Sequence, residues 1–103
     1  MSPELKARFD EEVKTHPIVL YMKGNQLFPQ CGFSARALEV LKPLGPVYSV
    51  NVLEDPAVRE GIKEYSNWPT IPQVYINGQF IGGCDIVTDL AARGELQALL
   101  KGG

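Results

Sequence analysis

Five consecutive apolar residues, Ile18–Met22, limit the fold of this chain more than any other feature of its sequence. A strand without polar alternation has to be covered on both faces, as the central strands of α/β proteins are. Apolar residues at helical spacing occur both before this run, in residues 5–13, and after it, in residues 34–44. The sequence therefore predicts a sheet that lies between helices.

The rest of the pattern predicts the order α-β-α-β-α-β-β-α-α. Asn77–Gly78 stands between the short runs Gln73–Ile76 and Gln79–Ile81, which predicts a type I′ hairpin. A second strand is predicted over Val47–Val52, and a right-handed crossover would make it parallel to the first. Asp85 is predicted to cap the helix that follows the hairpin. We expect one domain, residues 1–103, with a four-stranded mixed β-sheet flanked by about five α-helices.

Composition excludes several classes of protein. A hydrophobic content of 45% can supply a core, and a net charge of −2 argues against nucleic-acid binding. The N-terminal residues lack a signal-peptide pattern, and no apolar stretch approaches a membrane span. Two cysteines are too few for a secreted disulfide scaffold. We therefore expect a cytoplasmic or other reducing location.

Cys31 is the residue whose position most suggests chemistry. It lies where the polar loop of residues 23–30 gives way to a helical pattern, so unpaired N–H groups of the helix start would favour its thiolate. Lys23, at the end of the first strand, would add a positive charge if the loop folds back. The alternative is that Cys31 is a small buried apolar residue.

Ser34 occupies the position of the second thiol in a Cys-x-x-Cys pair. A hydroxyl cannot form the intramolecular disulfide of a dithiol redox cycle. Any disulfide at Cys31 would have to be resolved by an outside thiol or by Cys84, which leaves the role of Cys84 open.

Several segments together resemble the CGFS monothiol glutaredoxins over residues 17–100. They are Lys23–Gly24, Pro29, Cys31–Gly32–Phe33–Ser34, Trp68–Pro69–Thr70–Ile71–Pro72–Gln73 and Gly82–Gly83–Cys84–Asp85. The resemblance implies a thioredoxin-like (glutaredoxin) fold, which agrees with the predicted order of elements. One departure is Asn25–Gln26, where many members of the family have a small hydroxyl residue followed by proline.

The resemblance also implies a binding site for glutathione. Lys23 and Arg59 would pair with its glycyl carboxylate, and the backbone of Ile71, before a cis Pro72, with its cysteinyl part. The helix start at Asp85 would receive the γ-glutamyl end. The implied glutathione site comprises Lys23, Cys31, Phe33, Arg59, Thr70, Ile71, Pro72, Gly83, Cys84 and Asp85. Trp68 is interpreted as a packing residue.

For function, the resemblance implies a carrier of a [2Fe–2S] cluster. Such a cluster needs four ligands, which two copies of Cys31 and two glutathione molecules would supply. The cluster-bound form would then be a homodimer and the apo form a monomer. A BolA-like protein and recipient iron–sulfur apoproteins are the implied partners.

Two alternatives remain open. Cys31 could act as the nucleophile of a glutathione-dependent thiol–disulfide oxidoreductase, although Ser34 leads us to expect at most weak turnover. The chain could also be a redox-inert adaptor that only binds another protein.

Overall fold

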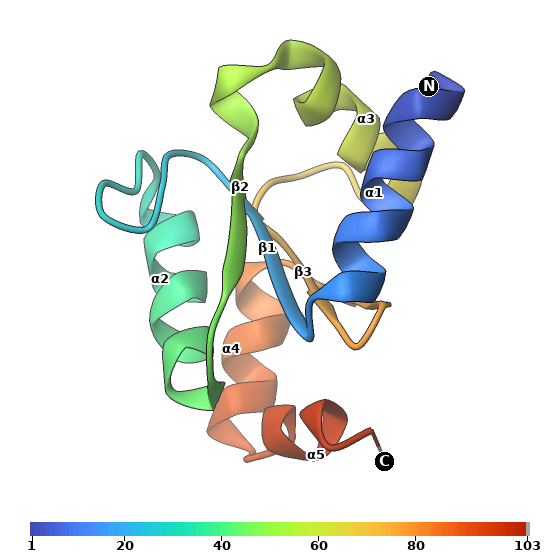
Figure 1. Cartoon of the computed structure of the whole chain (residues 1–103). Coiled ribbons are helices and arrows are strands. Elements are labelled where there is room, and N and C mark those ends of the chain that lie inside the picture. Colours follow the sequence, from blue (N-terminus) through green and yellow to red (C-terminus); the bar gives the residue numbers. More distant parts are fainter. Residues whose placement is uncertain (103) are drawn as a thin grey trace.

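The computed structural model describes residues 1–102, in which five α-helices alternate with four strands and two short 3₁₀ helices (Figure 1). In chain order they are α1 (Pro3–Thr15), β1 (Ile18–Met22), α2 (Gly32–Leu41), η1 (Lys42–Leu44), β2 (Tyr48–Asn51), η2 (Val52–Glu54), α3 (Pro56–Ser66), β3 (Gln73–Ile76), β4 (Gln79–Gly82), α4 (Cys84–Ala92) and α5 (Leu96–Leu100).

The strands form a single mixed sheet in the order β2-β1-β3-β4. β1 runs parallel to β2, with Val19 opposite Tyr48, and antiparallel to β3, with Tyr21 opposite Gln73. β4 completes the sheet as the antiparallel partner of β3. The predicted sheet and its mixed pairing are confirmed.

Each face of the sheet is covered by a different pair of helices, with α1 and α3 on one side and α2 and α4 on the other (Figure 1). All five residues of β1 are buried, as the apolar run predicts. Val19 and Tyr21 pack toward α1 and α3, whereas Ile18, Leu20 and Met22 pack toward α2 and α4. This alternation explains why the strand needs no polar residue.

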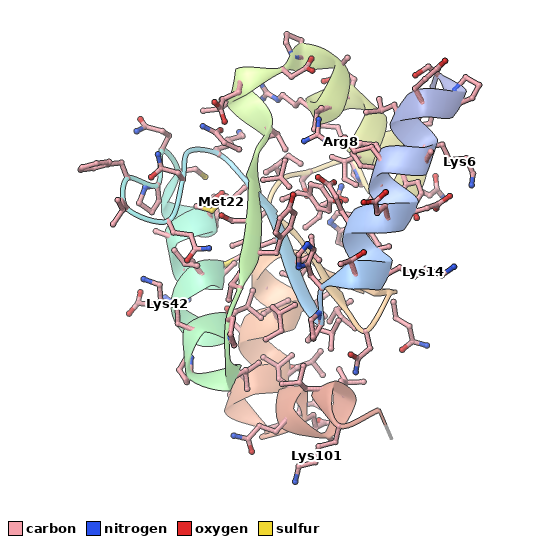
Figure 2. The ribbon with its side chains drawn as sticks, viewed as in Figure 1. Lys6, Arg8, Lys14, Met22, Lys42 and Lys101 are labelled. Atoms are coloured by element: carbon pink, nitrogen blue, oxygen red, sulfur yellow. The ribbon has the colours of Figure 1, made fainter. Side chains whose placement is uncertain are left out.

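Most charged side chains point outward, as Lys6 and Lys14 of α1 and Lys42 of η1 do in Figure 2. Glu12 is an exception, because it is only 8% exposed and accepts a hydrogen bond from the Tyr21 hydroxyl at 2.8 Å. Among the residues described, no helix combines the length and the apolar character that crossing a membrane requires.

The hairpin turn matches its prediction. Asn77 and Gly78 both have positive φ, at 50° and 81°, as a type I′ turn requires. The Asn77 side chain also donates from Nδ2 to the carbonyls of Leu99 and Leu100, at 3.0 and 2.8 Å. These bonds hold the turn against the end of α5.

The predicted capping role of Asp85 is wrong. α4 begins at Cys84, and its N-cap is Gly83, so Asp85 lies inside the first turn. Gly82 has a φ of 148° and Gly83 is extended, so the chain reaches the helical conformation two residues earlier than a capping aspartate would require. Other boundaries differ by one or two residues: α2 begins at Gly32 rather than Ser34, and β2 is shorter than Val47–Val52.

Candidate functional site

Cys31 is the N-cap residue of α2, with extended backbone and no side-chain capping bond. The pKa of its thiol lies below the ordinary value, chiefly because the backbone N–H of Ser34, in the first turn of α2, favours a negative charge on the sulfur. The Phe33 N–H and the charge of Lys23 also lower this pKa, whereas partial burial opposes them. The helix start therefore favours the thiolate, in the direction that the sequence predicts.

Ser34, which stands at the position of the second cysteine in a Cys-x-x-Cys pair, has a structural role. Its side chain is fully buried, and its Oγ accepts a hydrogen bond from the backbone N–H of Lys23 at 3.0 Å. This bond joins the end of β1 to the first turn of α2 and so helps to place Lys23 near Cys31.

The loop before Cys31 is held by its own side chains. Asn25 Oδ1 accepts from the N–H groups of Leu27 and Phe28 at 3.0 and 2.8 Å. Gln26 Nε2 donates to the carbonyl of Val47, next to β2, at 2.7 Å. Asn25 and Gln26 are the residues in which this chain departs from the family pattern, and they supply hydrogen bonds that fix the loop.

A cleft of about 490 Å³ opens beside Cys31. Lys23 directly after β1, the starts of α2 and α4, α3, and the connection between α3 and β3 contribute to it, although they are far apart in the sequence. The structure brings all ten residues of the predicted glutathione site together here. The cleft is lined by Lys23, Cys31, Phe33, Arg59, Lys63, Trp68, Pro69, Thr70, Ile71, Pro72, Gly83, Cys84, Asp85 and Ile86.

Four lining residues were not predicted as ligand contacts: Lys63, Trp68, Pro69 and Ile86. Lys63 follows Arg59 by four residues on α3, and this helical spacing could have identified it. Trp68 packs against Phe80, with ring centroids 5.6 Å apart, as the packing interpretation expects. It also contributes to the cleft, so its two roles are compatible.

The cleft has more positively than negatively charged side chains. Lys23, Arg59 and Lys63 supply positive charge, and Asp85 of α4 supplies the negative charge. Lys63 pairs with the exposed Glu60 at 3.3 Å. The Arg59 Nε is buried without a hydrogen-bond partner among residues 1–102. This arrangement favours a ligand with more negative than positive groups.

The backbone at Ile71–Pro72 forms one side of the cleft and lies close to the start of α4. The Ile71–Pro72 peptide bond is cis, and within the described part of the chain the backbone of Ile71 has no backbone hydrogen bond. A Cβ at Gly83 would lie 3.2 Å from the Pro72 carbonyl and 3.3 Å from Trp68 Nε1. Glycine at position 83 therefore permits the start of α4 to lie against Pro72 and Trp68.

Cys84 contributes to the same cleft as Cys31 but is only 7% exposed, and both cysteines are free thiols. Within residues 1–102 there is no group of three or more His, Cys, Asp or Glu residues that could hold a metal ion.

Apolar side chains are exposed on both sides of Cys31. Leu27 is 84% exposed, Phe28 69% and Phe33 64%, and we call these three residues the apolar rim. The first two lie in the fixed loop and the third in the first turn of α2. Large apolar side chains that are this exposed are typical of a surface that contacts another molecule.

Comparison with known proteins gives consistent matches. The glutaredoxin family model matches residues 18–81. The chain is 53% identical over 102 residues to an uncharacterized monothiol glutaredoxin ycf64-like from Synechocystis, covering 98% of this chain and 95% of that protein. It is 49% identical to the chloroplastic monothiol glutaredoxin-S7 of rice, covering 98% of this chain and 61% of that protein. The solution structure of reduced poplar apo GrxS14 is 50% identical, with a TM-score of 0.86, covering 97% of this chain and 93% of that one.

Proposed function

The chain belongs to the monothiol glutaredoxins, and from this premise we propose that it binds glutathione in the cleft and carries a [2Fe–2S] cluster on Cys31. The cluster is cargo, held between two subunits and delivered to iron–sulfur apoproteins. A BolA-like protein replaces one subunit in a mixed complex. The protein acts in the cytoplasm or another reducing compartment.

The cleft supports glutathione as the ligand. Its volume of about 490 Å³ suits a small peptide. Glutathione has two carboxylates and one ammonium, which matches three cations and the single carboxylate of Asp85. The unpaired backbone of Ile71 offers a donor and an acceptor to an extended peptide.

The observation that carries the cluster proposal is a single activated thiol without a second ligand beside it. A [2Fe–2S] cluster needs four ligands, usually thiolates. Cys31 offers one ligand per chain, because the Ser34 hydroxyl is hydrogen-bonded to the Lys23 N–H and Cys84 is buried. Two chains and two glutathione thiolates complete the set, and this stoichiometry requires a two-fold axis through the cluster. The apolar rim would then lie near the partner subunit.

Anaerobic reconstitution with iron, sulfide and glutathione tests this proposal. We expect a coloured protein of twice the 11.3 kDa monomer mass, which returns to monomer when the cluster is removed. Cys31→Ser should abolish both colour and dimer. Cys84→Ser is the matched control, because it removes a thiol of the same cleft that is not a proposed ligand. A wild-type protein that stays colourless and monomeric contradicts the proposal.

The lowered pKa of Cys31 also favours a second candidate, a glutathione-dependent oxidoreductase. In that reaction the Cys31 thiolate attacks the glutathione sulfur of a mixed disulfide and releases the substrate as a thiolate. A second glutathione thiolate then attacks the Cys31–glutathione disulfide, which restores Cys31 and forms oxidised glutathione. Rapid turnover of a glutathionylated peptide, together with failure to bind a cluster, would favour this function.

A further inference from the structure

Gln73, the first residue of β3, has no exposed surface, although its side chain is polar. It is one of three buried polar or charged residues in the described part of the chain, with Glu12 and Ser34. Glu12 and Ser34 have their side-chain oxygens hydrogen-bonded. The Oε1 atom of Gln73, in contrast, is buried without a partner among residues 1–102. An apolar residue would fill this position in a buried strand at less cost.

The nitrogen of the same amide makes two bonds to one wall of the cleft. Gln73 Nε2 donates to the carbonyl oxygen of Trp68 at 3.0 Å and to that of Thr70 at 3.2 Å. Both donor hydrogens of the amide are therefore used on residues 68–70, which we call the wall segment. All three residues of the wall segment line the cleft.

The wall segment has few other attachments. It lies between the end of α3 and the start of β3, outside any helix or strand. Its one backbone–backbone bond among the described residues joins the Trp68 N–H to the Lys63 carbonyl, and the same N–H also bonds to Ser66 Oγ at 3.1 Å, both at the end of α3. Between Trp68 and the strand, the two bonds from Gln73 are therefore the polar contacts that define its path.

We propose that Gln73 is a positioning residue, whose amide holds the wall segment in the shape that binds glutathione. This inference rests on the proposed glutathione site. The amide itself is absent from the lining of the cleft, so Gln73 would act through Trp68 and Thr70 rather than by touching the ligand. Its role explains why a half-bonded amide stands in a buried strand where packing alone would favour an apolar side chain.

Gln73→Met tests the inference, because methionine keeps the volume and flexibility of glutamine but removes both donors. We expect the dissociation constant for reduced glutathione, measured by NMR titration of the reduced monomer, to rise about tenfold. The pH at which Cys31 becomes reactive to alkylation should not change, since Gln73 is not among the groups that shift the Cys31 pKa. Gln73→Glu replaces the donors with acceptors that face two carbonyls, and should weaken binding at least as much.

Asn77 provides a matched control. Its amide also bridges two backbone carbonyls, those of Leu99 and Leu100, but it lies outside the cleft. Asn77→Asp tolerates the positive φ of this turn and should leave glutathione binding within about twofold of wild type.

The outcomes distinguish a failure of the proposed glutathione site from a failure of the positioning role of Gln73. A wild-type protein that does not bind glutathione removes the proposed function, and the inference with it. If the wild type binds but Gln73→Met binds equally well, only the positioning role is overturned. It is overturned as well if affinity falls together with a shifted Cys31 reactivity profile, or if both variants fail to fold, because the bridge then serves the fold as a whole.

Discussion

Replacing Gly61 with alanine should destabilise the protein, although alanine is the better helix former. Gly61 lies on α3 between Arg59 and Lys63, at the contact with α1. A Cβ at Gly61 would be 2.5 Å from Leu5 Cδ2 and 3.3 Å from Phe9 Cε2. Phe9 is completely buried, so the partly buried Leu5 side chain, which packs against the same core, is the one that has to change its conformation.

The expected magnitude follows from two opposing terms. Glycine to alanine in a helix interior gains about 0.5–1 kcal/mol. Overpacking a close contact costs about 1–3 kcal/mol. We expect a net loss near 1 kcal/mol in the free energy of unfolding, which would lower Tm by about 4–8 °C in a domain of this size.

A double-mutant cycle with Leu5→Ala measures this contact directly. Leu5→Ala removes the closest atom, so in that background Gly61→Ala should stabilise by about 0.5 kcal/mol. Urea denaturation of the four proteins gives the coupling energy, which we expect to be about 1–2 kcal/mol. Gly32→Ala in α2 is the control, because a Cβ there meets nothing within 4 Å. A Gly61→Ala variant that is more stable than the wild type, or additive effects of the two changes, would refute a steric conflict between the added Cβ and Leu5.

Two further predictions concern the loop that leads to Cys31. Lys23→Met removes a positive charge that favours the thiolate, so the pKa of Cys31 should rise and the alkylation profile should move to higher pH. The backbone N–H of Ser34 remains, so that profile should still lie below the profile in denaturant; an unchanged profile would show that Lys23 does not act on the thiol. Gly24→Ala should cost about 2–3 kcal/mol in urea denaturation, because φ is +89° and its Cβ would lie 2.5 Å from the backbone atoms Gln30 N and Phe28 O. A loss below about 0.5 kcal/mol would mean that the loop can rearrange at little cost.

Local patterns in the sequence predicted most of the fold. The type of each helix, strand and turn is set largely by residues that are close together in the sequence, so it could be read from those patterns. The apolar run Ile18–Met22 required cover on both faces of the strand, and Asn77–Gly78 fixed the hairpin by its two positive φ angles. The capping role of Asp85 was wrong, since the conformation of Gly82 and Gly83 decided where α4 begins. The exact end of a helix depends on the conformation of single residues such as these. Whether a segment is a helix or a strand depends on several residues together.

The site was predictable only in part. The Cys31 environment follows from its place at a helix start, and the family resemblance supplied most of the other residues that the structure gathers in the cleft. Lys63 was missed although its spacing from Arg59 was available. The ligand of the cleft and the cluster remain predictions for the experiments above.

The sequence by itself determined a layered α/β chain with one activated thiol at a helix start and no second thiol beside it. Only the tertiary structure decided how Ser34 and Gln73 use their side chains, and that Trp68 can pack on Phe80 while lining the cleft. The physical reason is the range of the interactions. Periodicity and capping depend on residues that are close in the sequence. The hydrogen-bond partner of a buried hydroxyl or amide depends on which separate segments the folded chain brings together.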